Sequence, residues 1–165
     1  MRIIDIVHDT IVDGAGFRTS VYVAGCGHGC KGCHNPETWD FNGGREMGED
    51  ELFAILSADD GDVTFTGGDP MYQATSLAPL LSRLKNAGKN IWVYTGFTYE
   101  ELIEGMETSL VLRFVDVLVD GPFVSSLKDG TLVFRGSSNQ RLVDVRKSRE
   151  EGRVVTLDLD YIPHF

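Results

Sequence analysis

The sequence contains little positive charge, no long apolar run and only three cysteines. Fifteen Lys and Arg residues stand against twenty-five Asp and Glu residues, which gives a net charge of −10. Proteins that bind along phosphate backbones concentrate Lys and Arg, so this charge argues against a nucleic-acid-binding protein. No apolar run approaches the roughly 18 residues of a membrane span, and the N-terminal MRIIDIVHDT becomes charged too early for a secretory signal. We therefore expect a cytoplasmic protein without nucleic-acid or membrane partners.

The chain has the length and composition of one globular domain. Its 165 residues are 42% hydrophobic and 24% charged, which is ordinary for a globular protein with its own core. No linker or low-complexity segment divides it. We expect a single domain over residues 1–165.

Short β-branched and aromatic runs alternate along the chain with amphipathic runs. The expected strands are TSVYVAG, GDVTFTGGDP, KNIWVYTG and FVDVLVDGPF. The expected helices are MGEDELFAILS, TYEELIEGM and the segment in which Leu77, Leu80, Leu81, Leu84 and Ala87 recur with helical spacing. This alternation predicts parallel βα units. Because a closed (βα)8 barrel needs about 200 residues or more, the predicted fold is α/β, an open partial (βα) barrel with a mostly parallel sheet of about five or six strands.

Unusual residues follow each expected strand. The cysteine loop, TGGDP, YTG and DGPF come directly after the four runs. In parallel α/β folds the carboxyl ends of the strands form the ligand-binding edge. The four loops should therefore converge on one face as an active site.

All the cysteines of the chain lie in the eight-residue window from Cys26 to Cys33, with Cys30 between them. A disulfide is disfavoured because the cytosol is reducing and one thiol would be left over. One interpretation is a structural zinc ion with His28 or His34 as the fourth ligand. The other is a 4Fe–4S cluster, in which three thiolates leave one iron open to a substrate.

The spacing C-x3-C-x2-C after a first strand resembles the radical S-adenosylmethionine superfamily. Within it, five stretches between Val12 and Val145 resemble the family that activates the anaerobic ribonucleoside-triphosphate reductase: VDGAGFRTSVYVAGCGHGCKGCHNPETW, TFTGGDP, IWVYTGF, VDVLVDGPF and FRGSSNQRLVDV. The extra cluster-binding cysteines common in other activases are absent from the sequence, which favours this family over activases of other glycyl radical enzymes.

The resemblance implies a fold of the radical S-adenosylmethionine type and a specific chemistry. Cys26, Cys30 and Cys33 would bind a 4Fe–4S cluster, and S-adenosylmethionine would chelate its fourth iron. An electron from a flavodoxin or ferredoxin-like donor would lead to cleavage of the cofactor into methionine and a 5′-deoxyadenosyl radical. That radical would install a glycyl radical on the large subunit of the reductase. A protein substrate that inserts a glycine-bearing loop would also close the gap of a partial barrel.

The same resemblance implies roles for the remaining site residues. Gly67 and Gly68 would let the backbone approach the amino group of the methionine moiety, and Asp69 would accept from it, unless Asp69 only caps the following helix. The adenine would contact Gly32, Cys33 and His34. The methionine or ribose would contact Thr95 and Asp120, either of which could instead only form a turn.

Other interpretations remain open from the sequence. The enzyme alternatives are an activase of another glycyl radical enzyme and a radical S-adenosylmethionine enzyme with a small-molecule substrate. The non-enzyme alternative is a zinc-stabilised or electron-transfer module. His28 and Lys31 would give the cysteine loop positive charge for an acidic electron donor, or simply be solvated.

Three further segments have alternative interpretations. Arg18 would position the cluster loop or the partner's glycine loop, or form a surface salt bridge. The side chains of FRGSSNQR would grip a backbone or another subunit, or form a polar turn between the strands TLVF and RLVDV. The tail VVTLDLDYI would add an edge strand or be partly loose.

Overall fold

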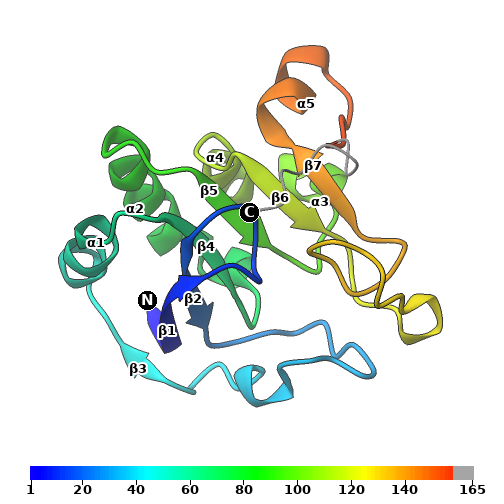
Figure 1. The fold of residues 1–165 in the computed structure, drawn as a ribbon, viewed down its shortest axis with the longest axis horizontal. Coiled ribbons are helices and arrows are strands. Elements are labelled where there is room, and N and C mark those ends of the chain that lie inside the picture. The colour runs from blue at the N-terminus through cyan, green and yellow to red at the C-terminus, as the bar shows by residue number, and fades with distance from the viewer. Residues whose placement is uncertain (158–165) are drawn as a thin grey trace.

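The protein is built on a seven-stranded mixed β-sheet with its main helices on one face (Figure 1). The computed structural model describes residues 1–157. The strands are β1 (Arg2–Thr10), β2 (Arg18–Val23), β3 (Arg45–Glu46), β4 (Asp62–Gly67), β5 (Ile91–Tyr94), β6 (Val117–Asp120) and β7 (Arg141–Asp144). The α-helices are α1 (Glu49–Ala58), α2 (Ala74–Asn86), α3 (Tyr99–Glu104), α4 (Met106–Leu112) and α5 (Val145–Glu151). Short 3-10 turns are η1 (Pro36–Thr38), η2 (Pro70–Gln73) and η3 (Ser125–Leu127).

The strand order is β3-β1-β2-β4-β5-β6-β7, and only the four central strands are mutually parallel. Strand β1 is antiparallel to both β2 and β3, and β7 is antiparallel to β6. The α/β class and the open sheet agree with the prediction, but a mostly parallel sheet of five or six strands was wrong. The loops 11–17 and 121–140 contain no crossover helix, so the strands they join run antiparallel.

The two faces of the sheet bury different residues. On the helix side, alternate residues of the parallel strands, such as Val63 and Phe65 of β4, join the large core beneath the helices. On the other face Trp92, Val119 and Leu142 form a smaller cluster that the loops 11–17 and 121–140 partly cover. This second face is the concave side of the open sheet and contains the cavity described below.

The helices follow the apolar periodicity of the sequence. Helix α2 buries Leu77, Leu80, Leu81 and Leu84, as the spacing predicts. The expected helix TYEELIEGM is interrupted at Gly105 and becomes α3 and α4. Helix α3 begins with a capping box in which Thr98 and Glu101 satisfy each other's backbone N–H groups. Among residues 1–157, no helix has both the length and the apolar character needed to cross a bilayer.

The C-terminal third differs from the sequence prediction in detail. The run TLVF is part of an irregular loop, whereas RLVD forms β7. Thr156 makes an isolated antiparallel bridge with Val143. The rest of the expected edge strand falls on residues 158–165, outside the described residues.

Candidate active site

The loops that follow β2, β4, β5 and β6 line one cavity of about 400 Å³. Its lining includes all three cysteines, the glycine pair after β4 and the Thr95–Gly96 turn after β5. The convergence arises because parallel strands place their carboxyl ends at the same edge of the sheet. The cavity continues along the concave face of the sheet, where Thr66, Tyr94 and Val119 form its floor.

The cysteine loop is held by backbone contacts that leave its thiols directed to the cavity. The N–H of Cys26 donates to the carbonyl of Trp39 (3.2 Å), and the N–H of Cys33 donates to the carbonyl of Cys30 (3.2 Å). The thiols are free and half-buried. Burial raises the pKa of the Cys26 thiol, so binding of a metal would displace its proton.

The donor set fits an iron–sulfur cluster better than a single metal ion. Within residues 1–157, no three His, Cys, Asp or Glu side chains lie close enough together to share one ion. Thiolates of a 4Fe–4S cluster bind different irons, so three thiols around one cavity suit it. The proposed zinc ligand His28 is also engaged elsewhere, and His34 is exposed.

Asp69 connects the cysteine loop to the strand ends. Its carboxylate is 1% exposed. The Oδ2 atom accepts from Nε2 of His28 (2.6 Å), from the Thr95 hydroxyl (2.9 Å) and from the N–H of Gly96 (2.9 Å). The Oδ1 atom accepts from the N–H of Met71 (3.0 Å), which is the helix-capping contact. His28 contacts Asp69 and its side chain is only 15% exposed, so it is not a solvated group of the loop surface. The hydrogen bond to Asp69 raises the pKa of His28.

The glycine pair lies against the backbone of β2 and the start of the cysteine loop. A Cβ on Gly67 would lie 2.6 Å from the backbone nitrogen of Val23, and one on Gly68 would lie 2.5 Å from the carbonyl oxygen of Gly25. Gly67 also has a φ of +97°, which favours glycine. Close packing of two chain segments therefore requires both glycines, independently of any ligand.

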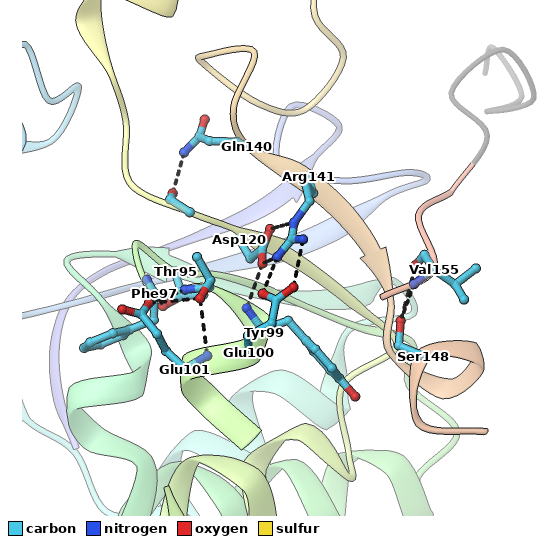
Figure 2. Close-up of polar contacts among 12 residues, drawn as sticks. Thr95, Phe97, Tyr99, Glu100, Glu101, Asp120, Gln140, Arg141, Ser148 and Val155 are labelled. Atoms are coloured by element: carbon cyan, nitrogen blue, oxygen red, sulfur yellow. Dashed lines mark hydrogen bonds and ion pairs between the residues drawn. The ribbon is translucent and has the colours of Figure 1, made fainter. Parts of the chain in front are cut away.

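Asp120 lies behind the cavity in an ion-pair network (Figure 2). Its carboxylate is buried and pairs with Arg141 at 2.6 Å, and it accepts the N–H of Tyr99 at 2.7 Å. Arg141 also pairs with Glu100 at 2.7 Å. The two carboxylates raise the pKa of Arg141 and keep it charged. The network ties the ends of β6 and β7 to the first turn of α3.

The segment FRGSSNQR grips the protein's own backbone. The Oε1 atom of Gln140 accepts from the N–H groups of Gly136 (2.9 Å) and Ser137 (3.2 Å). Its Nε2 atom donates to the carbonyl of Gly121 (3.0 Å; Figure 2). Asn139 donates in the same way to the carbonyl of Pro122 (2.8 Å). These contacts fix the loop 121–140 as a wall of the cavity.

Arg18 is neither a surface side chain nor part of a salt bridge in the described residues. It is buried, and its guanidinium donates to the Ala15, Val63 and Asn90 carbonyls and to the Thr64 hydroxyl at 2.8–3.0 Å. Burial lowers its pKa to about 10. The expectation of a surface salt bridge was wrong. Arg18 instead anchors the loop 11–17 to the concave face of the sheet.

Eight of the ten predicted site residues line the cavity: Cys26, Cys30, Cys33, His34, Gly67, Gly68, Asp69 and Thr95. Gly32 is exposed outside it, and Asp120 lies behind it. Sequence reasoning did not place several lining residues in the site: Val12, Asp13, Tyr94, Phe123, Phe134, Arg135 and Gln140. All of them lie in the stretches VDGAGFR, IWVYTGF, VDGPF and FRGSSNQR. These motifs therefore indicated the right segments, but not which of their residues line the cavity.

Comparisons with known proteins agree on the nature of the site. The sequence model of the family described as "4Fe-4S single cluster domain" matches residues 12–143. The chain is 40% identical over 141 residues to the anaerobic ribonucleoside-triphosphate reductase-activating protein of Salmonella typhi, covering 79% of this chain and 90% of that protein. Proteins of the same name from Escherichia coli K12 and Enterobacteria phage T4 are both 38% identical over 140 residues, covering 79% of this chain and 90% and 86% of the relatives.

Proposed function

Because this chain belongs to the family of anaerobic ribonucleoside-triphosphate reductase-activating proteins, we propose that it activates such a reductase by radical S-adenosylmethionine chemistry. The protein substrate is the large subunit of the reductase. A one-electron donor of the flavodoxin or ferredoxin type supplies the reducing equivalent. The observation that carries the proposal is that three free thiols and a glycine pair line one cavity at the carboxyl edge of the parallel strands.

In this proposal Cys26, Cys30 and Cys33 hold a 4Fe–4S cluster. When bound and reduced, the cluster supplies the electron that cleaves S-adenosylmethionine into methionine and a 5′-deoxyadenosyl radical, which takes a hydrogen atom from a glycine of the reductase. The protein contributes binding, orientation and exclusion of water. The wall formed by the loop 121–140 and the aromatic side chains of the cavity supports this exclusion.

The methionine end of S-adenosylmethionine would lie along Gly67 and Gly68, which line the cavity, while the absence of their Cβ atoms serves the packing against β2 and the cysteine loop. Thr95 and Asp69 line the same part of the cavity. Because four groups of the protein already donate to Asp69, it would act mainly by holding His28 and the cysteine loop in place. The adenine would lie near Cys33 and His34, with Gly32 in the adjoining turn. Asp120 would support the ribose side indirectly, through the position of Gly121.

Anaerobic reconstitution with iron and sulfide tests the proposal. The reduced protein should give a cluster signal in electron paramagnetic resonance that changes on addition of S-adenosylmethionine, and it should form 5′-deoxyadenosine. With the reductase present, a glycyl radical signal should appear on the large subunit. Bound zinc, or a cluster whose spectrum ignores S-adenosylmethionine, would contradict the proposal.

Single alanine substitutions of Cys26, Cys30 and Cys33 should each abolish the cofactor-responsive cluster and 5′-deoxyadenosine formation. Lys31→Ala is the matched control, because Lys31 lies in the same loop with an exposed side chain and should keep both. A cysteine variant that retains a stable cluster and cofactor cleavage would remove that residue from the ligand set.

A further inference from the structure

We infer that two apolar loop segments beside the cavity form the docking surface for the protein substrate. We call them the apolar rim and define it as Ile11 and Val12 of the loop 11–17 together with Leu127 and Val133 of the loop 121–140. This inference rests on the proposed function, because it assigns a place on this chain to the large subunit of the reductase.

The first observation is where exposed apolar side chains occur. Ile11 is 56% exposed and Val12 is 68% exposed, and the two are neighbours in the chain. Leu127 and Val133 are also exposed. Exposed apolar side chains that lie together mark interaction sites more often than isolated ones do. Here they occur in the two loops that flank the concave face of the sheet.

The second observation is continuity with the cavity. Val12 is both exposed and part of the cavity lining, and Phe123 and Phe134 line it from the loop 121–140. A segment that covers Val12 therefore touches the cavity itself. A partial barrel leaves this side of the cavity without a protein cover in the described residues, and an incoming chain segment would supply one.

The third observation is that both loops are rigidly supported although their apolar side chains are exposed. Arg18 donates to the carbonyl of Ala15, and Thr64 donates to the carbonyl of Asp13, which fixes the first loop to the sheet. In the second loop, Phe134 adopts a φ of +59° and packs edge-on against Trp92, with ring centroids 5.2 Å apart. A non-glycine residue held in this conformation is typical of functional segments. Preformed loops lower the ordering cost of docking.

The cavity wall also provides hydrogen-bond donors for an inserted chain segment. The cavity offers a single Lys or Arg among its lining residues, Arg135. One N–H of its guanidinium donates to the carbonyl of Gln140 (2.7 Å), which leaves further donors. These suit main-chain carbonyls of an inserted loop, because a guanidinium is a multiple donor and no acceptor.

A second exposed apolar group provides the matched control. Met106 and Leu110 of α4 are 89% and 44% exposed, but no residue of α4 lines the cavity, whereas both rim loops contribute lining residues. Glutamates, including Glu104 and Glu107, surround them in the sequence with no Lys or Arg between residues 98 and 112. If exposure of apolar side chains alone decided where the reductase docks, the surface of α4 around Met106 and Leu110 would bind it as well as the apolar rim does.

The test uses the reconstituted protein and the reductase large subunit from the same organism. Three paired variants are compared: Ile11→Asp with Val12→Asp, Leu127→Asp with Val133→Asp, and Met106→Asp with Leu110→Asp. Each rim pair should weaken binding to the large subunit by roughly tenfold or more, because a carboxylate replaces an apolar contact at the centre of an interface. The α4 pair should bind like the wild type. Thermal unfolding midpoints verify that each pair folds.

Glycyl radical yield gives an independent readout. At limiting reductase the rim variants should give less radical. For the Leu127→Asp with Val133→Asp pair, neither of which lines the cavity, excess reductase should restore the yield, because only affinity is altered. A deficit in this pair that excess reductase does not restore, rim variants that bind like the wild type, or a loss confined to the α4 pair would each overturn the inference. A wild-type protein that neither binds nor activates the reductase would instead refute the proposed function, and the docking surface with it.

Discussion

Asp69 shows how one residue can determine the geometry of a whole site. Its buried carboxylate accepts four hydrogen bonds, which join the cysteine loop, the turn after β5 and the start of η2. Replacing a buried carboxylate of this kind destabilises the folded protein, because the groups that donate hydrogen bonds to it are left without an acceptor. A single residue therefore connects the cysteine loop to the ends of the strands.

We expect Asp69→Asn to lower the free energy of unfolding by about 3 kcal/mol, because an amide NH2 cannot accept from the donors grouped at one carboxylate oxygen. Urea denaturation of the protein without metal measures this loss. Glu37→Gln is the control, since Glu37 is exposed and should change stability by less than about 0.5 kcal/mol. A variant as stable as the wild type would show that the contacts of Asp69 are not needed for folding.

Gly68→Ala should also destabilise the protein, by about 2 kcal/mol, because the new Cβ would lie 2.5 Å from the carbonyl oxygen of Gly25 and one backbone segment must move. The same measurement applies. Gly130→Ala meets no atom within 4 Å and should be nearly neutral. Equal stabilities of the two variants would argue against the close packing at Gly68.

At the scale of elements, the Asp120–Arg141 pair joins β6, β7 and α3. Strand β7 has only four residues. Its position therefore depends on contacts other than its backbone hydrogen bonds with β6. The pair supplies such a contact, and Gln140 and Asn139 supply others at the same strand end. The wall of the cavity is thus fastened where the antiparallel strand begins.

Arg141→Met should cost about 3 kcal/mol, because it leaves the Asp120 carboxylate buried without its counter-charge. Arg146→Met is the matched control: its pair with Glu150 is highly exposed and should contribute less than about 1 kcal/mol. Unfolding in urea compares the two. A similar small loss in both variants would mean that water already solvates Asp120 in the folded protein.

The elements that sequence reasoning identified correctly are those with local signals. The periodicity of α2 and the β-branched runs of β2, β4, β5 and β6 are contained in the residues themselves. The direction of β7 is not, because pairing partners rather than local pattern decide whether a strand runs parallel. Strand β1 was not expected as a strand, although Ile3, Ile4, Ile6 and Val7 make its first half rich in β-branched residues.

The same distinction applies to the site. The cysteines and the glycine pair are visible as short motifs. The contacts of His28 with Asp69 and of Asp120 with Arg141 join residues 41 and 21 positions apart. Single residues in such pairs look like turn formers or solvated charges until the fold brings them together. Arg18 was misjudged for this reason, since its acceptors are carbonyls of distant segments.

At the scale of the whole molecule, carboxylates dominate the charge, and several are stabilised by folding. Hydrogen bonds from the Thr19 hydroxyl and His8 lower the pKa of Asp59, and Arg141 lowers the pKa of Glu100. A carboxyl with a lower pKa in the folded state contributes stability above its unfolded pKa, and loses it as the pH falls through the folded pKa.

The free energy of unfolding should therefore decline as the pH falls below about 4.5, where unfolded Asp and Glu begin to bind protons. Urea titrations from pH 7 to pH 3 measure the decline. Glu100→Gln should reduce its slope, because one of the responsible groups no longer titrates. If the free energy of unfolding of the variant declines with the same slope as that of the wild type, other carboxyl groups cause the acid sensitivity.

Residues 155–157 bond along the outer side of β7. The N–H of Asp144 donates to the carbonyl of Val155 (2.8 Å), and the N–H of Leu157 donates to the carbonyl of Leu142 (2.9 Å). An exposed β-strand edge is a template on which other chains can add strands and aggregate. The chain occupies this template with its own backbone. The sheet edge beside the cavity wall is thereby kept from recruiting unrelated chains.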